Sequence, residues 1–362
     1  MGRDRVRGII WDGQRLFMTD RLEVRAPGKG EVKVRVLASG ICHSDLNMID
    51  AGMIGTPVVL GHEAAGVVAE LGEGVSGLAL GDAVMVGTQT PCGHCRECER
   101  DEPANCDETW GFVPGQPFRL EGQPVYSFAN VSSFAGEIVV KATQLYPTQN
   151  LPPEQAALIG CAVSTGFCAA QTLGRVRSGD RVAVIGVGGI GVNAIQGARL
   201  AGASVLAVDL NPAKEAVARG FGADRFVLSE RGQGAQALAA ALQAEASPID
   251  VIVECSGAPV AIEAALHAVK RGGRVVLVGM TSPGASVPLG LDAMLSGREI
   301  VSVMNGGARP EQDYPRLIEL ARTRQIDLES QVSQVWPLDQ FEEAIAALRA
   351  GTVTRAVLDH TA

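Results

Sequence analysis

Apolar and charged residues alternate along the first part of the chain. The segment 31–40, EVKVRVLASG, shows this most clearly, and a period-2 pattern is typical of a strand with one buried face. Turns rich in glycine and proline recur at short intervals up to about residue 147. The pattern therefore predicts a β-rich domain in the N-terminal part of the chain.

From about residue 180 the pattern changes to short apolar runs that alternate with alanine-rich helical stretches. Strands are expected at 182–186, 204–209, 225–228, 250–254, 274–279 and 299–303. Helices are expected at 189–201, 212–221, 235–246 and 259–270. Strands that alternate with helices need crossover connections, so they form a parallel sheet covered by helices on both faces. Six such strands predict a doubly wound nucleotide-binding domain of the α/β class.

The C-terminal part of the chain adds two predicted helices, at 311–324 and 338–350, and a short strand in TRAVLDH at 354–360. These elements can pack back onto the N-terminal domain and make it discontinuous. We therefore expect one domain from residues 1–161 with 306–362, and a cofactor domain from residues 162–305.

A glycine-rich hexapeptide, GVGGIG at 186–191, stands between the first strand and the first helix of the second domain. It fits G-x-G-x-x-G, and a strand before it with a helix after it is the context in which this pattern binds a dinucleotide. Gly186 allows a tight turn, Gly188 lets the backbone approach a pyrophosphate, and Gly191 lets the helix lie close to the strand. The helix N-terminus then offers its N–H groups to the phosphates.

The next strand ends in Asp209, 23 residues after Gly186. A carboxylate there accepts hydrogen bonds from the adenosine ribose and repels a 2′-phosphate, and Lys214 can reach the ribose. The sequence therefore favours NAD over NADP, and the alternative is a glycine-rich turn followed by a surface aspartate. The residues assigned to the cofactor on these grounds are Gly186, Gly188, Gly189, Ile190, Gly191, Asp209, Lys214 and Val278.

Four of the eight cysteines stand close together in PCGHCRECERDEPANC, with the spacing C-x2-C-x2-C-x7-C. They are Cys92, Cys95, Cys98 and Cys106. Four thiolates can complete a tetrahedral shell around Zn²⁺ and leave no position for a substrate, which predicts a structural site. Disulfides are the alternative, but C-x2-C spacing suits metals, and the polar N-terminus MGRDRVRG lacks the apolar core of a signal peptide.

Three other residues are candidates for a second metal: Cys42 in SGICHSD, His62 in VLGHEAAG and Cys161 in IGCAVSTG. Their spacing alone does not define a metal site. A lone buried cysteine is usually a small core residue, and a lone histidine is usually held by hydrogen bonds in a structural role.

The chain as a whole resembles the zinc-containing medium-chain alcohol dehydrogenases. The resemblance is carried by CHSD at 42–45, GHE at 61–63, the four-cysteine loop, GCAVSTG at 160–166, and GVGGIG with Asp209, which cover nearly the whole chain in the family's order. It implies a β-rich GroES-like catalytic domain joined to a doubly wound, Rossmann-type cofactor domain. It also implies that Cys42, His62 and Cys161 bind a catalytic zinc with one position open to substrate.

The resemblance implies further roles in the site. Asp45 would accept the second ring N–H of His62, Ser44 would take the proton of the substrate alcohol, and Glu63 would be an acidic neighbour of the metal. The alternative for Glu63 is a charge buried with a basic partner. Thr165 would lie near the nicotinamide, and Arg355 would contact the pyrophosphate; the alternative for Arg355 is an exposed side chain on a terminal strand.

Three features depart from well-known relatives. Asn47 stands where a proton-relay histidine is often found, and His43 stands where many relatives carry an arginine on the pyrophosphate. The segment 108–137 carries aromatic residues that line either a substrate pocket or a loop core. These are Trp110, Phe112, Phe118, Tyr126, Phe128 and Phe134. An apolar pocket favours benzylic or medium-chain alcohols, and a similar segment occurs in relatives that oxidise thiol adducts of formaldehyde.

Composition and charge limit the partners. The formal net charge of −9 is unfavourable for binding nucleic acids or anionic membranes, and no apolar run approaches the ~18 residues of a membrane span. We expect a cytoplasmic, NAD-dependent dehydrogenase with two zinc ions per chain. It would interconvert a primary alcohol and an aldehyde as a homodimer, or as a homotetramer. The alternatives are a thiol-dependent formaldehyde dehydrogenase and a non-catalytic protein that binds zinc and nucleotide.

Overall fold

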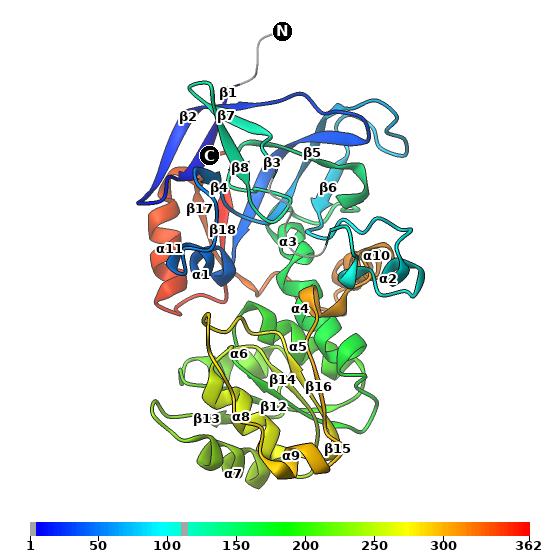
Figure 1. Ribbon diagram of the computed structural model, residues 1–362, viewed down its shortest axis with the longest axis vertical. Helices are drawn as coiled ribbons and strands as arrows, with labels where there is room; N and C mark the ends of the chain where they lie inside the picture. Colours follow the sequence, from blue (N-terminus) through cyan, green and yellow to red (C-terminus); the bar gives the residue numbers. More distant parts are fainter. Residues whose placement is uncertain (1–4, 110–114) are drawn as a thin grey trace. The chain divides into compact units, whose positions relative to one another are not determined.

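The computed structural model describes residues 5–109 and 115–362 (Figure 1). The chain forms two compact units: unit 1 comprises Met1–Cys161 and Pro310–Ala362, and unit 2 comprises Ala162–Arg309. The sequence predicts the second boundary after residue 305, slightly earlier than the structure has it. The expected fold class is confirmed, because unit 1 is β-rich and unit 2 is built on a doubly wound parallel sheet.

Unit 1 contains a small closed barrel and a larger sheet. The barrel has the strand order β1 (Arg5–Trp11), β2 (Leu16–Val24), β7 (Phe118–Leu120), β8 (Gln123–Ser127) and β4 (Val58–Val59). The sheet has the order β10 (Leu145–Pro147), β6 (Ala83–Val86), β5 (Glu63–Leu71), β3 (Glu31–Ile41), β18 (Arg355–Asp359) and β17 (Val332–Pro337), and β9 (Glu137–Lys141) also pairs with β3. The alternating segment at 31–40 is thus the central strand β3, as predicted.

Three neighbouring strands bring distant parts of the chain together at one end of this sheet. β5 and β18 both run antiparallel to β3, and the last residues of β3, Gly40 and Ile41, pair with the first residues of β5 and β18. The end of β3 therefore lies beside the starts of its two neighbours. Cys42 follows β3, His62 precedes β5, and Arg355 begins β18, so the register of the sheet brings these three residues together.

Helices of unit 1 cover the sheet or follow its strands. Their bounds are α1 (His43–Asp50), α2 (Arg96–Glu99), α3 (Pro153–Ala156), α10 (Pro310–Arg322) and α11 (Phe341–Arg349). In α11, Phe341, Ala344 and Leu348 are buried, a spacing that places one face of the helix against the core. The predicted helices at 311–324 and 338–350 are α10 and α11. Short single-turn helices lie at Pro103–Asn105, Ala142–Gln144, Ala157–Gly160 and Leu338–Gln340.

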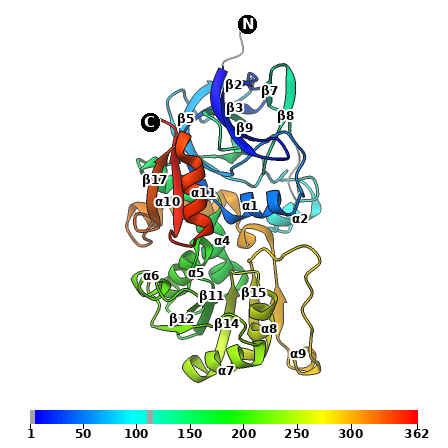
Figure 2. The same cartoon turned by 90° about the vertical axis from the view of Figure 1, so that its left-hand side faces the viewer.

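Unit 2 is a six-stranded parallel sheet, and Figure 2 shows β12, β11, β14 and β15 in this order across it. The full order is β13 (Arg225–Leu228), β12 (Ser204–Asp209), β11 (Arg181–Ile185), β14 (Ile249–Glu254), β15 (Val269–Leu277) and β16 (Glu299–Val301). The helices are α4 (Ala162–Cys168), α5 (Gly189–Leu200), α6 (Lys214–Gly220), α7 (Ala235–Ala246), α8 (Pro259–Ala268) and α9 (Leu291–Leu295). A π-helical turn (Ala169–Leu173) and a short turn (Met304–Gly307) complete the unit.

The continuous apolar runs of unit 2 arise because both faces of its sheet are covered. Val182 and Val184 of β11 pack in one cluster with α5, whereas Ala183 and Ile185 pack in a second cluster with α7 and α8. Strand β15 begins earlier than the expected 274–279. Its register with β14 shifts between Val269 and Arg274, so the strand runs through the glycines at 272 and 273 with a local irregularity.

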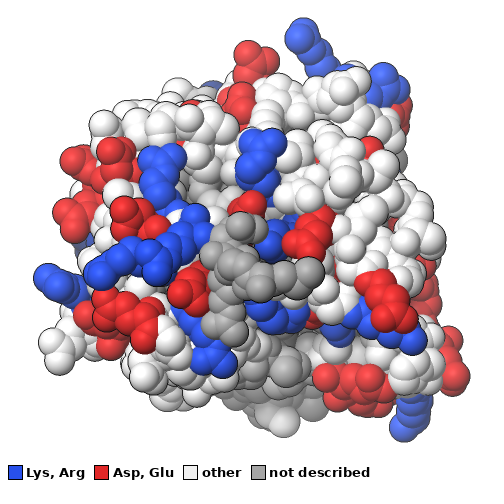
Figure 3. All heavy atoms as spheres, turned by 90° about the horizontal axis from the view of Figure 1, so that it is seen from above, with Lys and Arg blue, Asp and Glu red and all other residues white. Residues whose placement is uncertain are grey.

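Charges of both signs are mixed on one face of the molecule (Figure 3). On the face seen in Figure 3, acidic and basic side chains are interspersed, and neither sign forms a broad uniform patch. Among the described residues, no single helix has the length and apolar character needed to cross a membrane. One bent pair of consecutive helices, Pro153–Gly160 with Ala162–Leu173, passes that test on length and composition only.

The variant Gly191→Ala tests how closely α5 approaches the glycine-rich turn. A Cβ at this position would come within 1.8 Å of the Gly186 carbonyl oxygen, which belongs to the backbone and cannot swing aside. We expect the free energy of unfolding to fall by about 1–3 kcal/mol, measured by thermal and urea-induced unfolding.

The matched control is Gly220→Ala in helix α6, where an added Cβ meets nothing within 4 Å. This variant should be as stable as the parent protein or slightly more stable, because alanine has the better helix propensity. A Gly191→Ala protein as stable as Gly220→Ala would contradict the close packing.

Candidate metal and cofactor sites

Four side chains that can ligate a metal lie close together in unit 1, near the end of β3 and the start of β5. Cys42 is the N-cap of α1, His62 and Glu63 stand at the start of β5, and Cys161 follows the single-turn helix at 157–160. All four are buried, and one ligand atom from each lies within 4.8 Å of the others. Sequence spacing did not indicate this cluster, and only the resemblance did.

A buried carboxylate fixes the geometry of this cluster. Asp45 is fully buried, and its Oδ2 accepts the backbone N–H of Cys42 at 3.0 Å. Its Oδ1 accepts the backbone N–H of Gly61 at 3.1 Å and lies 3.0 Å from His62 Nδ1. Nδ1 therefore carries the proton, and Nε2 presents its lone pair toward the cluster. Ser44 Oγ lies 3.3 Å from the same Nε2.

Phe128 also constrains the His62 ring, which it meets edge to face with the ring centroids 5.7 Å apart. Phe128, Phe118 and Phe134 are buried in the core of unit 1, so a loop core is the right interpretation for these three residues. Tyr126 is partly buried against the same core. Trp110 and Phe112, from the same predicted aromatic set, lie outside the described residues.

Charges within the cluster shift one another's protonation. A contact with Cys161 lowers the pKa of the Cys42 thiol well below its usual value, although burial acts in the opposite direction. The same contact, together with burial, raises the pKa of Cys161. Burial disfavours a charged His62, but Asp45 and Cys42 together outweigh burial and raise the pKa of the imidazole. The two thiols, the imidazole and Asp45 are thus close enough to influence one another's charge.

Glu63 is buried with a basic partner, Arg355, which is itself almost completely buried. Arg355 Nη2 lies 3.1 Å from Glu63 Oε1, and Arg355 Nη1 donates to the Ile41 carbonyl at 3.3 Å. Burial raises the pKa of Glu63 to about 7, although the positive charge of Arg355 opposes this shift. An added Cβ on Gly40 would come within 1.9 Å of Glu63 Oε2, so the pair needs a glycine there.

Arg355 is therefore not an exposed side chain on a terminal strand. It lies beside the metal-ligating cluster, and the negative charges of Glu63, Cys42 and Cys161 raise its pKa although burial acts against the charged form. The expected contact of Arg355 with the cofactor pyrophosphate stays a prediction. His43, the first residue of α1, is exposed.

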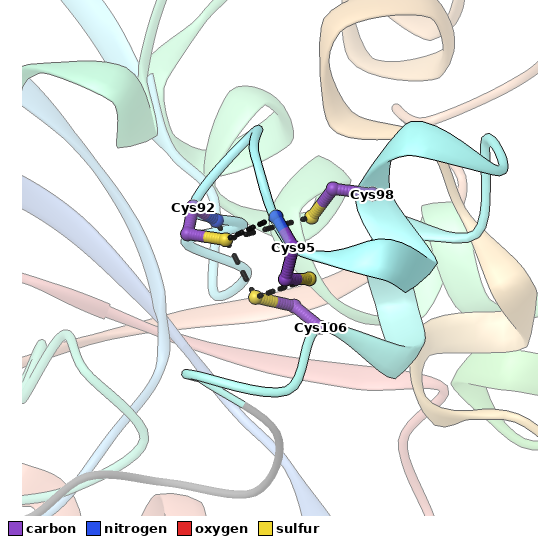
Figure 4. Close-up of side chains that lie close together, drawn as sticks. All are labelled: Cys92, Cys95, Cys98 and Cys106. Carbon is purple, nitrogen blue, oxygen red and sulfur yellow. Dashed lines mark hydrogen bonds between the residues drawn. The ribbon is translucent and has the colours of Figure 1, made fainter.

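The four cysteines of the second cluster point toward a common centre (Figure 4). The sulfur atoms of Cys92 and Cys98 are 4.0 Å apart, and those of Cys95 and Cys106 are 3.9 Å apart. Zn–S bonds of about 2.3 Å in a tetrahedron place the sulfurs about 3.8 Å apart, so the donors fit zinc. The Cys92 N–H also points to Cys106 Sγ at 3.4 Å, and the Cys95 N–H points to Cys92 Sγ at 3.3 Å.

The glycine-rich turn of unit 2 has the geometry of a phosphate cradle. Gly186 adopts a φ of +94°, which favours glycine, and Gly188 is the N-cap of α5. An added Cβ on Gly188 would meet nothing within 4 Å, so the space above this backbone is open to a ligand. The two glycines and the helix N-terminus therefore fit a dinucleotide pyrophosphate.

Asp209 is held beside this turn by the backbone. Its Oδ2 accepts the Val187 N–H at 2.8 Å, and its Oδ1 accepts the Asn211 N–H at 2.9 Å. Lys214 is buried nearby, and its pKa is lowered by burial although Asp209 acts in the opposite direction. Gly189 and Ile190 form the first turn of α5, Thr165 is buried within α4, and Val278 directly follows β15.

Comparison with known proteins agrees with this geometry. Residues 28–152 match the alcohol dehydrogenase GroES-like domain, and residues 189–323 match the zinc-binding dehydrogenase domain. The S-(hydroxymethyl)glutathione dehydrogenase of Haemophilus influenzae is 33% identical over 355 residues, which cover 94% of this chain and 93% of the relative.

Solved structures give the same result. The benzyl alcohol dehydrogenase of Acinetobacter calcoaceticus has a TM-score of 0.88 and 26% identity, with 98% of this chain and 99% of that chain covered. An alcohol dehydrogenase zinc-binding domain protein from Burkholderia ambifaria has a TM-score of 0.90 and 28% identity, with 99% of both chains covered. These matches are to dehydrogenases over nearly the whole chain, which argues against a non-catalytic protein that binds zinc and nucleotide; zinc and NAD are the typical cofactors of the family. The chain belongs to the family of zinc-containing medium-chain alcohol dehydrogenases.

Proposed function

We propose that the chain interconverts a primary alcohol and an aldehyde with NAD, at a zinc held by Cys42, His62 and Cys161. The observation that carries this proposal is the buried cluster of two thiols and one imidazole, with the imidazole oriented by Asp45. Zinc bound by such a set lowers the pKa of an alcohol at its open position, and NAD accepts the hydride. Soft sulfur donors with an imidazole suit zinc better than they suit magnesium or calcium.

The protein groups around the cluster have separate tasks. We propose that Ser44, whose Oγ lies 3.3 Å from His62 Nε2, accepts the proton of the substrate hydroxyl. Asp45 keeps the tautomer and ring orientation of His62. Arg355, which is almost completely buried, balances the negative charge of the thiolates and of Glu63. Asn47 has no titratable group, so we propose that the proton continues from Ser44 toward the exposed His43 side of α1.

We propose a second, structural zinc in the four-cysteine cluster. All four ligand positions are cysteine sulfurs, so a bound ion has no place for substrate and serves only to hold the loop. For the cofactor, the backbone-held carboxylate of Asp209 supports NAD over NADP, because a 2′-phosphate would meet its negative charge.

Paired cysteine variants test the two zinc assignments. The parent protein should contain two zinc ions per chain by elemental analysis. Cys161→Ser should lose one zinc and most of the alcohol-dependent formation of NADH, on the order of 100-fold or more, while its melting temperature changes little. Cys95→Ser should lose the other zinc and should melt at a lower temperature, because the closed site ties down a loop.

The control is Cys168→Ser, which alters a buried cysteine outside both clusters and should retain two zinc ions. Retention of two zinc ions by both Cys161→Ser and Cys95→Ser would show that the assignments are wrong.

The relatives suggest two substrate classes. A similar solved structure is named a benzyl alcohol dehydrogenase, which makes an apolar primary alcohol the first candidate. The curated relatives at 33% identity are named S-(hydroxymethyl)glutathione dehydrogenases, which makes the thiol adduct of formaldehyde the second candidate.

Kinetics with matched substrates separate the two classes. We expect NADH to form from benzyl alcohol and from medium-chain primary alcohols without any thiol. We also expect kcat/KM for formaldehyde with glutathione to be at least about tenfold lower than for benzyl alcohol. A reversed order, with activity on formaldehyde only when glutathione is present, would replace the first candidate with the second.

We propose that two copies of the chain associate through unit 2. Strand β16 is an edge of the six-stranded sheet, and no other described strand pairs with its outer side. Large apolar side chains in and beside this edge are exposed: Leu289, Leu291, Met294, Leu295 and Ile300. An exposed edge with apolar neighbours is a site for pairing with another chain, and a two-fold axis would extend the sheet. A tetramer of two such dimers is the alternative.

Light scattering after gel filtration tests this association. The parent protein should have twice the chain mass of 37.7 kDa, and Ile300→Lys should shift it to the monomer mass, because a lysine on an edge strand opposes pairing. The control is Leu80→Lys, which alters an exposed leucine of unit 1 and should leave the mass unchanged. A monomeric parent protein would contradict the proposal.

The proposed location is the cytoplasm. All eight cysteines, each among the described residues, are free thiols, and six of them lie in metal-ligating clusters. A reducing compartment keeps such thiols available for zinc.

A further inference from the structure

Among the described residues of unit 2, one acidic side chain is buried. Glu254 is the last residue of β14, after a run of isoleucine and valine, and its exposed fraction is 0%. Burial raises its pKa. A carboxylate in an apolar sheet is costly unless hydrogen bonds compensate for the lost water, so its partners indicate what it does.

The side chain of Glu254 binds the loop that follows its own strand. Oε1 accepts the backbone N–H of Ser256 at 2.8 Å and also accepts the Ser256 hydroxyl. The backbone N–H of Gly257 lies 3.0 Å from Oε2 and 3.2 Å from Oε1. The loop after β14 is therefore folded back over the carboxylate.

The main chain of Glu254 binds a second loop, the one that follows β15. Its carbonyl oxygen accepts the N–H groups of Val278 at 2.9 Å and of Gly279 at 3.0 Å. The two loops touch through their backbones, because an added Cβ on Gly257 would come within 2.2 Å of the Met280 carbonyl oxygen. One residue therefore sets the position of both loops.

These loops adjoin the glycine-rich turn. The N–H of Cys255 donates to the Ile185 carbonyl at 2.8 Å, and an added Cβ on Gly186 would lie 3.2 Å from the Ser256 nitrogen. The turns after β11, β14 and β15 therefore form one continuous rim at the carboxyl ends of three adjacent strands.

The order of the sheet assigns this rim to one half of the cofactor. β12, which carries Asp209, lies on one side of β11, and β14 and β15 lie on the other side. A dinucleotide crosses such a sheet at the point where the strand order reverses. With its pyrophosphate at the glycine-rich turn and its adenosine ribose at Asp209, its second nucleotide must extend over the ends of β14 and β15.

We propose that Glu254 is a positioning residue for the nicotinamide half of the cofactor. It acts through the loops 255–257 and 278–280, whose backbones it holds at a set distance from the glycine-rich turn. The inference rests on the proposed cofactor site at that turn. It adds a specific consequence, which is that Glu254 controls the nicotinamide half of the site and leaves the adenosine half unaffected.

The chemistry of the side chain explains why an amide would not replace it. Both oxygens of Glu254 accept N–H groups, and Oε1 accepts a hydroxyl as well. In Glu254→Gln one acceptor becomes an NH₂ group, which would face the Gly257 N–H donor against donor. The volume is unchanged, so the fold should persist while the loop after β14 moves.

Two ligands that differ only in the nicotinamide test this proposal on the full-length protein. Binding of NADH and of ADP-ribose to the parent protein and to Glu254→Gln is measured by calorimetry, with thermal unfolding as a check on the fold. We expect the Kd for NADH to rise about tenfold and the Kd for ADP-ribose to stay within about twofold. Ser256→Ala, which removes one hydroxyl donor to the carboxylate, should weaken NADH binding in the same direction by a smaller factor.

The matched control is Glu245→Gln, which alters an exposed glutamate of α7 and should leave both Kd values unchanged. Equal weakening of both ligands in Glu254→Gln, or no weakening of either, would overturn the positioning role. A parent protein that binds neither ligand would instead overturn the proposed cofactor site, and the inference with it.

Discussion

The hydrogen bonds of the buried Asp45 carboxylate are the interaction on which the metal-ligating cluster depends. Asp45 holds the backbone of Cys42, the backbone before β5 and the His62 ring at once. None of these groups could change place without leaving a charged oxygen buried and unsatisfied, which costs more than the loss of an ordinary hydrogen bond. The sheet brings the end of β3 near the start of β5, and the Asp45 carboxylate then fixes the positions of the Cys42 sulfur and the His62 nitrogen.

In unit 2, acidic side chains also hold loops by accepting their backbone N–H groups. Asp209 accepts backbone N–H groups from the glycine-rich turn and from the start of the next connection, and Glu254 accepts them from the loop after β14. In each case an acidic side chain at the carboxyl end of a strand orders irregular backbone that regular hydrogen bonding cannot reach. These hydrogen bonds fix the shape of the loops at the carboxyl ends of the strands. Ligands of open parallel sheets bind at these loops.

A buried ion pair between Arg355 and Glu63 lies beside the metal-ligating cluster. Arg355 brings a permanent positive charge into this buried region, beside Glu63 and the two cysteines. A buried ion pair is weak evidence for stability, because desolvation offsets much of the attraction. Its consequence here is spatial: the pair holds the start of β5 against the start of β18, and it requires a glycine at position 40.

The sequence alone determined most of the architecture and one of the metal sites. Alternation in 31–40 predicted the central strand β3, the six apolar runs predicted the parallel sheet, and C-x2-C-x2-C-x7-C predicted the four-cysteine cluster. Only the tertiary structure decided that Arg355 pairs with Glu63, that Phe128 packs on His62, that β15 runs through its glycines, and that Glu254 binds two loops. Periodicity and short spacing report neighbours within one element. Cys42 and Arg355, more than 300 residues apart, come together through strand order and register, which no local pattern encodes.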